Sequence, residues 1–265
     1  MDGNRRGFLK ATGLTILALG TGSVTVLRTA RARSDASSQP GGAPPGAAPA
    51  LRGSRWALLV DTTRCKAREG CKDCSAACHL VHNVPALPEP KHEVKWIWTE
   101  QFRHVFPDAG HEFMAPAALE RPLPLLCNQC ENPPCVRVCP TKATWKRADG
   151  IVMMDWHRCI GCRFCVVGCP YGARSFNWRD PRPFVLQQNP DFPTRTRGVV
   201  EKCNFCEERL ARGLLPSCVG ACKHQALVFG DLDDPSSEIR RRLRAVRTLR
   251  RKPALGTSPK VFYVV

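Results

Sequence analysis

The sequence predicts an α+β fold that is rich in loops, with short β-hairpins and insertions between them. Three observations support this prediction: sixteen cysteines fall in four groups of four, Pro and Gly are frequent (23 and 20 of 265 residues), and the apolar stretches are short. Frequent Pro and Gly interrupt long helices and strands. No apolar run of about 20 residues lies beyond the N-terminus, so the composition excludes a coiled coil, a collagen-like chain and a polytopic membrane protein.

The N-terminal segment has the order of parts found in export signals. Arg5 and Arg6 stand in a basic segment, residues 11–27 are moderately apolar, and Ala-Arg-Ala at 30–32 matches a small-x-small cleavage pattern. The paired arginines, followed by Gly-Phe-Leu-Lys, resemble a twin-arginine signal. An ordinary secretory signal or an uncleaved anchor has the same parts. We expect a signal peptide over residues 1–32 and a protein that is exported, already folded, to the periplasm.

The rest of the chain divides by composition. Residues 33–54 are rich in Pro, Gly, Ala and Ser without a periodic pattern, which predicts a disordered linker. All sixteen cysteines follow, in a domain expected over residues 55–232. A C-terminal helix and tail are expected over residues 233–265. Short apolar runs predict strands at residues 55–60, 151–155, 227–229 and 261–265.

The predicted C-terminal helix is amphipathic and strongly basic. Ser236 or Ser237 is placed to cap it, and its apolar stripe consists of Ile239, Leu243, Val246 and Leu249. Arginines occupy the remaining faces. Such a helix is either solvated or in contact with an acidic subunit or anionic lipid headgroups.

The cysteine spacing carries the functional prediction. The four groups are Cys65, Cys71, Cys74 and Cys78; Cys127, Cys130, Cys135 and Cys139; Cys159, Cys162, Cys165 and Cys169; and Cys203, Cys206, Cys218 and Cys222. The third group has the spacing Cys-x2-Cys-x2-Cys-x3-Cys-Pro of bacterial ferredoxins, in which the fourth cysteine binds the other cluster of a pair. The second group ends in the same way. We therefore expect tandem bacterial-ferredoxin-like modules that bind four 4Fe–4S clusters.

The same rule assigns four ligands to each cluster. The first site is expected to consist of Cys65, Cys71, Cys74 and Cys222, the second of Cys78, Cys203, Cys206 and Cys218, the third of Cys127, Cys130, Cys135 and Cys169, and the fourth of Cys139, Cys159, Cys162 and Cys165. The third and fourth sites follow the ferredoxin spacing closely. The first and second sites contain the longer gaps Cys65-x5-Cys71 and Cys206-x11-Cys218, which leave a three-iron cluster or a missing cluster open there.

Other uses of sixteen cysteines fit the spacing less well. Eight disulfides would need strained local bridges between near neighbours. Zinc sites come as separated Cys-x2-Cys pairs, and a c-type haem needs Cys-x2-Cys-His. A basic zinc module remains the remote alternative, because the formal charge is +17. Cluster anions account for much of this excess, so no nucleic acid is expected as a partner.

No catalytic constellation is visible in the sequence, so we expect an electron-transfer subunit and not an enzyme. Arg137, Arg158 and Arg163 lie within the cysteine loops and either tune reduction potentials or are ordinary solvated charges. Residues 79–126 form an insertion with several aromatic side chains. These side chains either contact a partner protein or pack over the clusters, and the sequence favours neither alternative.

The motifs resemble a known family. The cysteine groups over residues 65–231 are similar to the four-cluster subunits of polysulfide, nitrite and dimethyl sulfoxide reductases. The stretch Gly-Cys-Lys-Asp-Cys-Ser-Ala-Ala-Cys-His from Gly70 and the stretch Cys-Asn-Gln-Cys-Glu-Asn-Pro-Pro-Cys from Cys127 more narrowly resemble the periplasmic iron–sulfur subunit of the membrane complex associated with dissimilatory sulfite reductase.

The resemblance implies partners and a role. It implies a polytopic quinone-interacting membrane subunit, a periplasmic multihaem cytochrome c and further subunits of the sulfite-reductase-associated complex. Membrane association would then be through these partners. The implied role is electron transfer between quinone and periplasmic haem in dissimilatory sulfur metabolism. The alternative is the iron–sulfur subunit of a polysulfide, nitrite or molybdopterin reductase complex.

Overall fold

The computed structural model describes residues 49–265; the expected signal peptide, with Arg5 and Arg6, and most of the expected linker lie outside the described residues. The strands are β1 (Trp56–Asp61), β2 (Ile97–Gln101), β3 (Pro122–Leu126), β4 (Thr144–Lys146), β5 (Val152–Met154), β6 (Ser175–Phe176), β7 (Val200–Glu201), β8 (Leu227–Asp231), β9 (Thr248–Leu249) and β10 (Val261–Val264). The α-helices are α2 (Asp73–Val81), α3 (Phe102–Val105), α4 (Pro116–Leu119), α5 (Pro134–Arg137), α6 (Phe164–Val167), α7 (Glu207–Leu210), α8 (Ser217–Gly220) and α9 (Glu238–Ala245). These short elements and the loops between them confirm an α+β fold.

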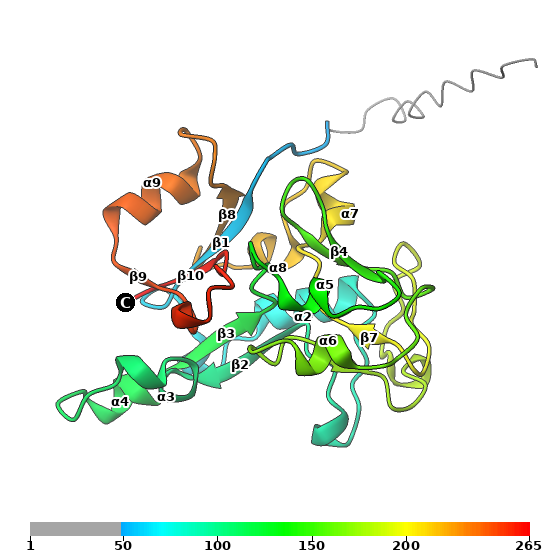
Figure 1. The fold of residues 1–265 in the computed structure, drawn as a ribbon. Helices are drawn as coiled ribbons and strands as arrows, with labels where there is room; N and C mark the ends of the chain where they lie inside the picture. Colours follow the sequence, from blue (N-terminus) through cyan, green and yellow to red (C-terminus); the bar gives the residue numbers. More distant parts are fainter. Residues whose placement is uncertain (1–48) are drawn as a thin grey trace, which may run out of the picture. The chain divides into compact units, whose positions relative to one another are not determined.

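One four-stranded sheet joins the two ends of the described chain, in the order β8-β1-β10-β9 (Figure 1). Strand β1 pairs parallel to β10 and antiparallel to β8, with Leu58 opposite both Val261 and Phe229. Every residue of β1 is buried, because α9 covers one face of the sheet and the main core lies against the other. The sheet fixes the ends of the loops that carry the first and last cysteine groups.

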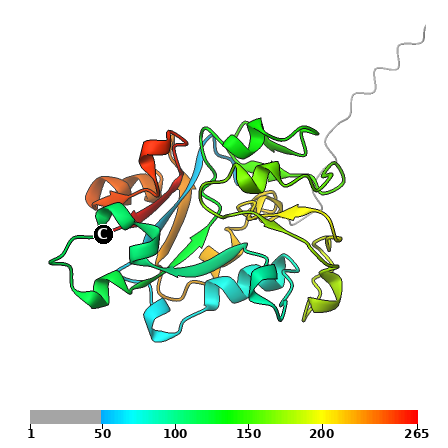
Figure 2. The same ribbon diagram turned by 60° about the horizontal axis from the view of Figure 1, so that its bottom comes forward.

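Three two-stranded antiparallel sheets flank the remaining cysteine loops: β2–β3, β4–β5 and β6–β7 (Figure 2). The hairpin β4–β5 lies between the second and third cysteine groups in the sequence, and Thr144 stands opposite Met154 in its register. Both residues are buried beside cysteines of these groups. The predicted strand at residues 151–155 is thus one arm of a hairpin.

The C-terminal region differs from the expected helix and tail. Helix α9 ends at Ala245, and Val246, which was expected in its apolar stripe, is already extended. Leu249 lies in β9 and pairs with Tyr263 of β10. Since β10 lies between β1 and β9, the boundary expected at residue 232 does not separate two structural units.

The expected linker also ends earlier than its composition suggests. The Leu51 amide donates to the Leu210 carbonyl at 2.8 Å, and the Ser54 amide donates to the Asp231 carboxylate at 2.8 Å. Within residues 49–265 we find no helix with both the length and the apolar character needed to cross a bilayer.

Candidate iron–sulfur centres

All sixteen cysteines lie in the described part of the chain, and all are free thiols. A framework of eight disulfides therefore does not describe this fold. Most of the thiols are buried or half-buried, and Cys162 is the exposed exception. Buried thiols that lie together in groups fit a role as metal ligands, since a thiol that is buried only for packing does not require other thiols beside it.

The four cysteines of the expected first site line one cavity, together with the loop after β1 and the start of α2. Burial raises the pKa of Cys74 to about 11, and the nearby thiols of Cys65, Cys222 and Cys71 add to the shift. The four side chains come from both ends of the cysteine-bearing region. The sheet brings them together, because β1 ends just before Cys65 and β8 begins just after Cys222.

The four cysteines of the expected second site are all buried, with 3–7% of each side chain exposed. Burial raises the pKa of Cys78 well above its ordinary value, and Cys203, Cys206 and Cys218 contribute in that order. Helix α2 carries Cys78, and it packs against α8, which carries Cys218. Two helices and the loop before α7 thus direct these thiols toward one another.

The expected third site combines the loop after β3 with the last cysteine of the following group. Burial raises the pKa of Cys130 to about 12, and the thiols of Cys127, Cys135 and Cys169 raise it further. Cys135 lies on α5, and Cys169 follows α6. The last cysteine of one ferredoxin-like run therefore lies beside the first three of the other.

The four cysteines of the expected fourth site line a second cavity, at the base of the hairpin β4–β5. The loop Cys159-Ile-Gly-Cys162 is tight here: Gly161 has a φ of +70°, and a Cβ on it would lie 2.4 Å from the Gly198 carbonyl oxygen. Only glycine combines this backbone conformation with so close an approach. Its presence allows the loop to fold around the cavity.

The four sites follow one another in a line. Burial is the leading cause of the raised pKa of Cys78, Cys203 and Cys165, and a thiol of the adjacent site adds to each shift: Cys74 acts on Cys78, Cys127 on Cys203, and Cys135 on Cys165. The second site is fully buried, whereas the first consists of half-exposed cysteines and the fourth includes exposed Cys162. The line therefore has a buried middle and two ends that reach the surface.

The residues present fit iron–sulfur clusters. Burial raises the pKa values of half of these thiols, with at least one in each site, so their thiolate form needs a compensating cation. Cluster iron supplies that charge and accepts four thiolates from converging directions. Backbone amides support the sulfurs: Phe205 donates to Cys203 at 3.4 Å, and Ala226 donates to Cys222 at 3.3 Å.

Two buried cations lie between the sites. Arg174 is 4% exposed and donates to the Thr144 hydroxyl at 2.8 Å. Burial lowers its pKa, but the thiols of Cys135 and Cys165 outweigh burial and raise it above the ordinary value. Arg174 thus acts on the third and fourth sites together.

Lys202 occupies the corresponding place between the second and third sites. It is 1% exposed, and its ammonium group donates to the carbonyls of Val152 and Cys203. Burial lowers the pKa of Lys202, and the thiols of Cys127 and Cys203 oppose that shift. In contrast, Arg137, Arg158 and Arg163 of the cysteine loops are exposed.

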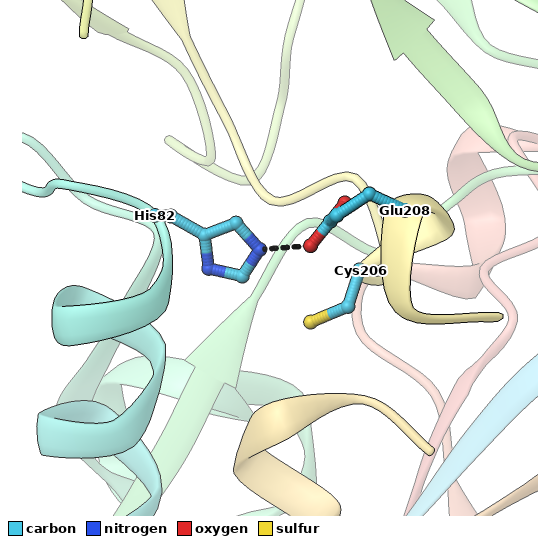
Figure 3. A group of neighbouring side chains, drawn as sticks. All are labelled: His82, Cys206 and Glu208. Carbon is cyan, nitrogen blue, oxygen red and sulfur yellow. Dashed lines mark hydrogen bonds and ion pairs between the residues drawn. The ribbon is translucent and has the colours of Figure 1, made fainter. Parts of the chain in front are cut away.

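His82 contacts the second site (Figure 3). Its Nδ1 donates to the Cys78 carbonyl at 2.8 Å, and its Nε2 lies 3.0 Å from the Glu208 carboxylate. His82, Cys206 and Glu208 place one ligand atom each within 4.8 Å of one another. Burial disfavours the protonated ring, but hydrogen bonds to Cys206 and Glu208 outweigh it and raise the pKa of His82 to about 9. Sequence reasoning missed this residue, although its position four residues after Cys78 at the end of a helix is a usable signal.

Comparison with known proteins identifies the cofactor type. A family model described as a 4Fe–4S dicluster domain matches residues 121–182. The matched segment contains the expected third site and fourth site in full. The comparison therefore favours iron–sulfur clusters over zinc in this part of the chain.

Several relatives are similar over most of the chain. Iron–sulfur subunit 1 of an Hdr-like menaquinol oxidoreductase from Archaeoglobus fulgidus is 43% identical over 229 residues, covering 79% of this chain and 82% of the relative. The B subunit of the polysulfide reductase of Wolinella succinogenes is 39% identical over 211 residues, covering 79% and 94%. Protein NrfC of Escherichia coli is 34% identical over 266 residues, covering 100% and 96%. By these similarities, the chain belongs to the family of iron–sulfur electron-transfer subunits of oxidoreductase complexes.

Proposed function

We propose that the chain binds four 4Fe–4S clusters, one at each of the four sites, and passes single electrons along their line. The observation that carries this proposal is the arrangement of the thiols: four adjacent groups of four, with a buried middle and two ends at the surface. When bound, such clusters accept and release single electrons. The chain's own residues hold the groups in order, shield the middle from water and place Arg174 and Lys202 between neighbours.

The proposed partners lie at the two ends of this line. We propose a polytopic quinone-interacting membrane subunit and a periplasmic multihaem cytochrome c, within a sulfite-reductase-associated complex of dissimilatory sulfur metabolism. The name of the Archaeoglobus fulgidus relative includes menaquinol, and a relative from Nitratidesulfovibrio vulgaris, 34% identical, is a menaquinone reductase subunit. Polysulfide and tetrathionate reductase subunits are also among the relatives. They support the alternative of a different reductase complex equally.

The fold organisation and location complete the proposal. The ligand sets imply two interlocked ferredoxin-like modules, the third and fourth sites in one and the first and second in the other. The twin-arginine signal over residues 1–32 implies export to the periplasm of a protein that already holds its clusters. Attachment to the membrane would then be through partner subunits.

Metal analysis tests the cluster proposal directly. Anaerobically purified protein should contain four irons and four acid-labile sulfides for every four cysteines, and redox-titrated electron paramagnetic resonance should resolve four centres. Zinc at one atom per four cysteines, with no sulfide, would instead establish the basic zinc module. Iron sufficient for only two clusters, with the ferredoxin-like sites filled, would restrict the proposal to the third and fourth sites.

The export proposal has its own experiment. Replacing both Arg5→Lys and Arg6→Lys should leave the protein in the cytoplasm, because the twin-arginine route depends on the arginine pair. Cell fractionation and immunoblotting measure the distribution. Unchanged periplasmic delivery of the double variant would exclude the twin-arginine route.

A further inference from the structure

The C-terminal region carries a run of exposed arginines that have no carboxylate partner among the described residues, although Arg250 lies over the Phe262 ring at 5.8 Å from its centroid. Arg241, Arg244, Arg247 and Arg250 recur every three residues, the first two on α9 and the last two on either side of β9, and all four are exposed. None of them forms an ion pair with any residue between 49 and 265. We call these four residues the arginine segment. In contrast, the neighbouring Arg242 pairs with the Asp61 carboxylate at 2.5 Å.

Helix α9, which carries Arg241 and Arg244, is fixed beside the first site. Asp61, the partner of Arg242, ends β1, and its carbonyl accepts a hydrogen bond from the Cys65 amide at 3.0 Å. Glu238, at the start of α9, lines the same cavity as Arg64 and Cys222. Helix α9 therefore contacts both chain segments that supply thiols to this half-exposed end of the line.

The apolar side of α9 is already used. Ile239 is fully buried against Ala57, Leu59 and Val228 of the sheet, and Leu243 packs on the same cluster. A helix that binds a bilayer surface needs a free apolar face to insert below the headgroups. The apolar face of α9 packs on its own sheet and is not free to insert into a bilayer. The arginines could still bind headgroups by charge, but without insertion a lipid surface is the weaker candidate.

We propose that the arginine segment is the docking surface for an acidic redox protein that exchanges electrons at the first site. This inference rests on the electron-transfer function proposed above. Unpaired surface arginines attract an acidic partner over long range and orient it before contact, which raises association rates by about 10- to 1,000-fold. The proposed partner is thus a protein with a carboxylate-rich surface around its own redox group.

The test uses the cluster-loaded chain and an acidic flavodoxin as the electron-donating probe. Stopped-flow absorbance would follow reduction of the chain at a series of salt concentrations. In a segment variant, R241Q, R244Q, R247Q and R250Q are combined. We expect its bimolecular rate to fall about tenfold or more at low salt, and the difference to vanish at about 1 M salt, where the screening length is about 3 Å.

A charge-matched variant provides the control. Lys91→Gln, Arg103→Gln, Arg179→Gln and Arg197→Gln remove the same four charges from exposed positions on other elements. This variant should keep most of the wild-type rate. Equal loss in both variants would assign the effect to net charge alone and overturn the proposal, as would an unchanged rate in the segment variant or a wild-type rate that does not fall with salt.

Two further measurements separate the remaining outcomes. Flotation with vesicles of phosphatidylcholine and phosphatidylglycerol tests lipid binding. A segment variant that loses vesicle binding but keeps its rate with flavodoxin would overturn the proposal in favour of a membrane contact. Iron and sulfide analysis of each sample comes first, because a chain without iron would contradict the proposed function and not the docking surface.

Discussion

At the scale of single residues, Arg174 is the charge placed to influence two sites at once. It is buried, and the hydroxyl of Thr144 fixes its guanidinium. The thiols of Cys135 and Cys165, from the third and fourth sites, both raise its pKa. A fixed positive charge in a dry environment stabilises the more negative, reduced form of a nearby cluster.

Replacing Arg174→Gln should therefore lower the reduction potentials of the third and fourth sites. The glutamine removes the charge and retains a donor for Thr144. A tenfold shift of a one-electron equilibrium corresponds to about 59 mV, which redox-titrated paramagnetic resonance resolves. The first and second sites should titrate as in the unmodified protein.

Two comparisons isolate the role of this charge. Arg174→Lys keeps the charge and should restore most of the potential. Arg163→Gln removes an exposed arginine that stacks on Trp178, with the guanidinium 4.7 Å from the ring centroid, and should leave both potentials nearly unchanged. Equal shifts in reduction potential from Arg163→Gln and Arg174→Gln would mean that a buried arginine affects these sites no more than an exposed one.

The contrast between these arginines shows what a single sequence reveals about a site. Cysteine spacing is a local feature, so the sequence alone is enough to propose four ligand sets. The cations could not, because burial depends on contacts between distant segments. Arg163 adjoins Cys162 but is exposed and stacks on Trp178, whereas Arg174 is buried, lies outside every cysteine run and is close enough to two of them for their thiols to raise its pKa.

Cys162→Ser tests the ligand assignment at the fourth site. Cys162 is the exposed thiol among four that line one cavity, and serine is a poor substitute for a thiolate. We expect loss of one cluster by iron analysis, with a drop in thermal stability because metal binding is coupled to folding. A folded variant that retains all four clusters would contradict the assignment.

At the scale of elements, the loop of the fourth site depends on the Gly161 backbone. A Cβ there would lie 2.4 Å from the Gly198 carbonyl oxygen, on the segment that leads into β7. Backbone atoms cannot yield as a flexible side chain can. The positive φ of Gly161 adds the usual conformational cost for any other residue.

Gly161→Ala should consequently displace the loop and reduce occupancy of the fourth site. Gly172→Ala is the matched control: its φ is +65°, close to the +70° of Gly161, but no atom lies within 4 Å of the added methyl. The control should cost only about 1–2 kcal/mol of stability, from the conformation alone. Iron content and thermal melting distinguish them, and equal behaviour of both variants would show that the close approach is unimportant.

Whether a segment forms a helix or a strand could be predicted from the sequence more readily than which strands pair with one another. The apolar runs at the two ends of the domain predicted β1 and β10, but nothing local indicates that these distant strands pair in parallel. The periodicity of the C-terminal arginine region predicted α9 but extended it too far. Val246 and Leu249 keep helical spacing in sequence, yet pairing of β9 with β10 ends the helix first.

At the scale of the whole molecule, the fold separates a protected interior from two contact points. The second site is buried on all sides, between α2, α8 and the loop before α7. The first and fourth sites have half-exposed or exposed cysteines. If the four sites hold clusters as proposed, electrons that enter at one end would reach the other through the middle sites, because tunnelling falls steeply with distance.

Cys206→Ser tests that requirement, since it removes a ligand from the buried second site and leaves both ends intact. The first, third and fourth sites should still be reduced by dithionite in the variant, each with its own paramagnetic signal. Transfer between the ends should stop, because the proposed route passes through the second site. Rapid-freeze resonance after reduction by an acidic protein donor would show the signal of the first site alone. Appearance of the fourth-site signal at the wild-type rate would mean that the four sites do not form a single line.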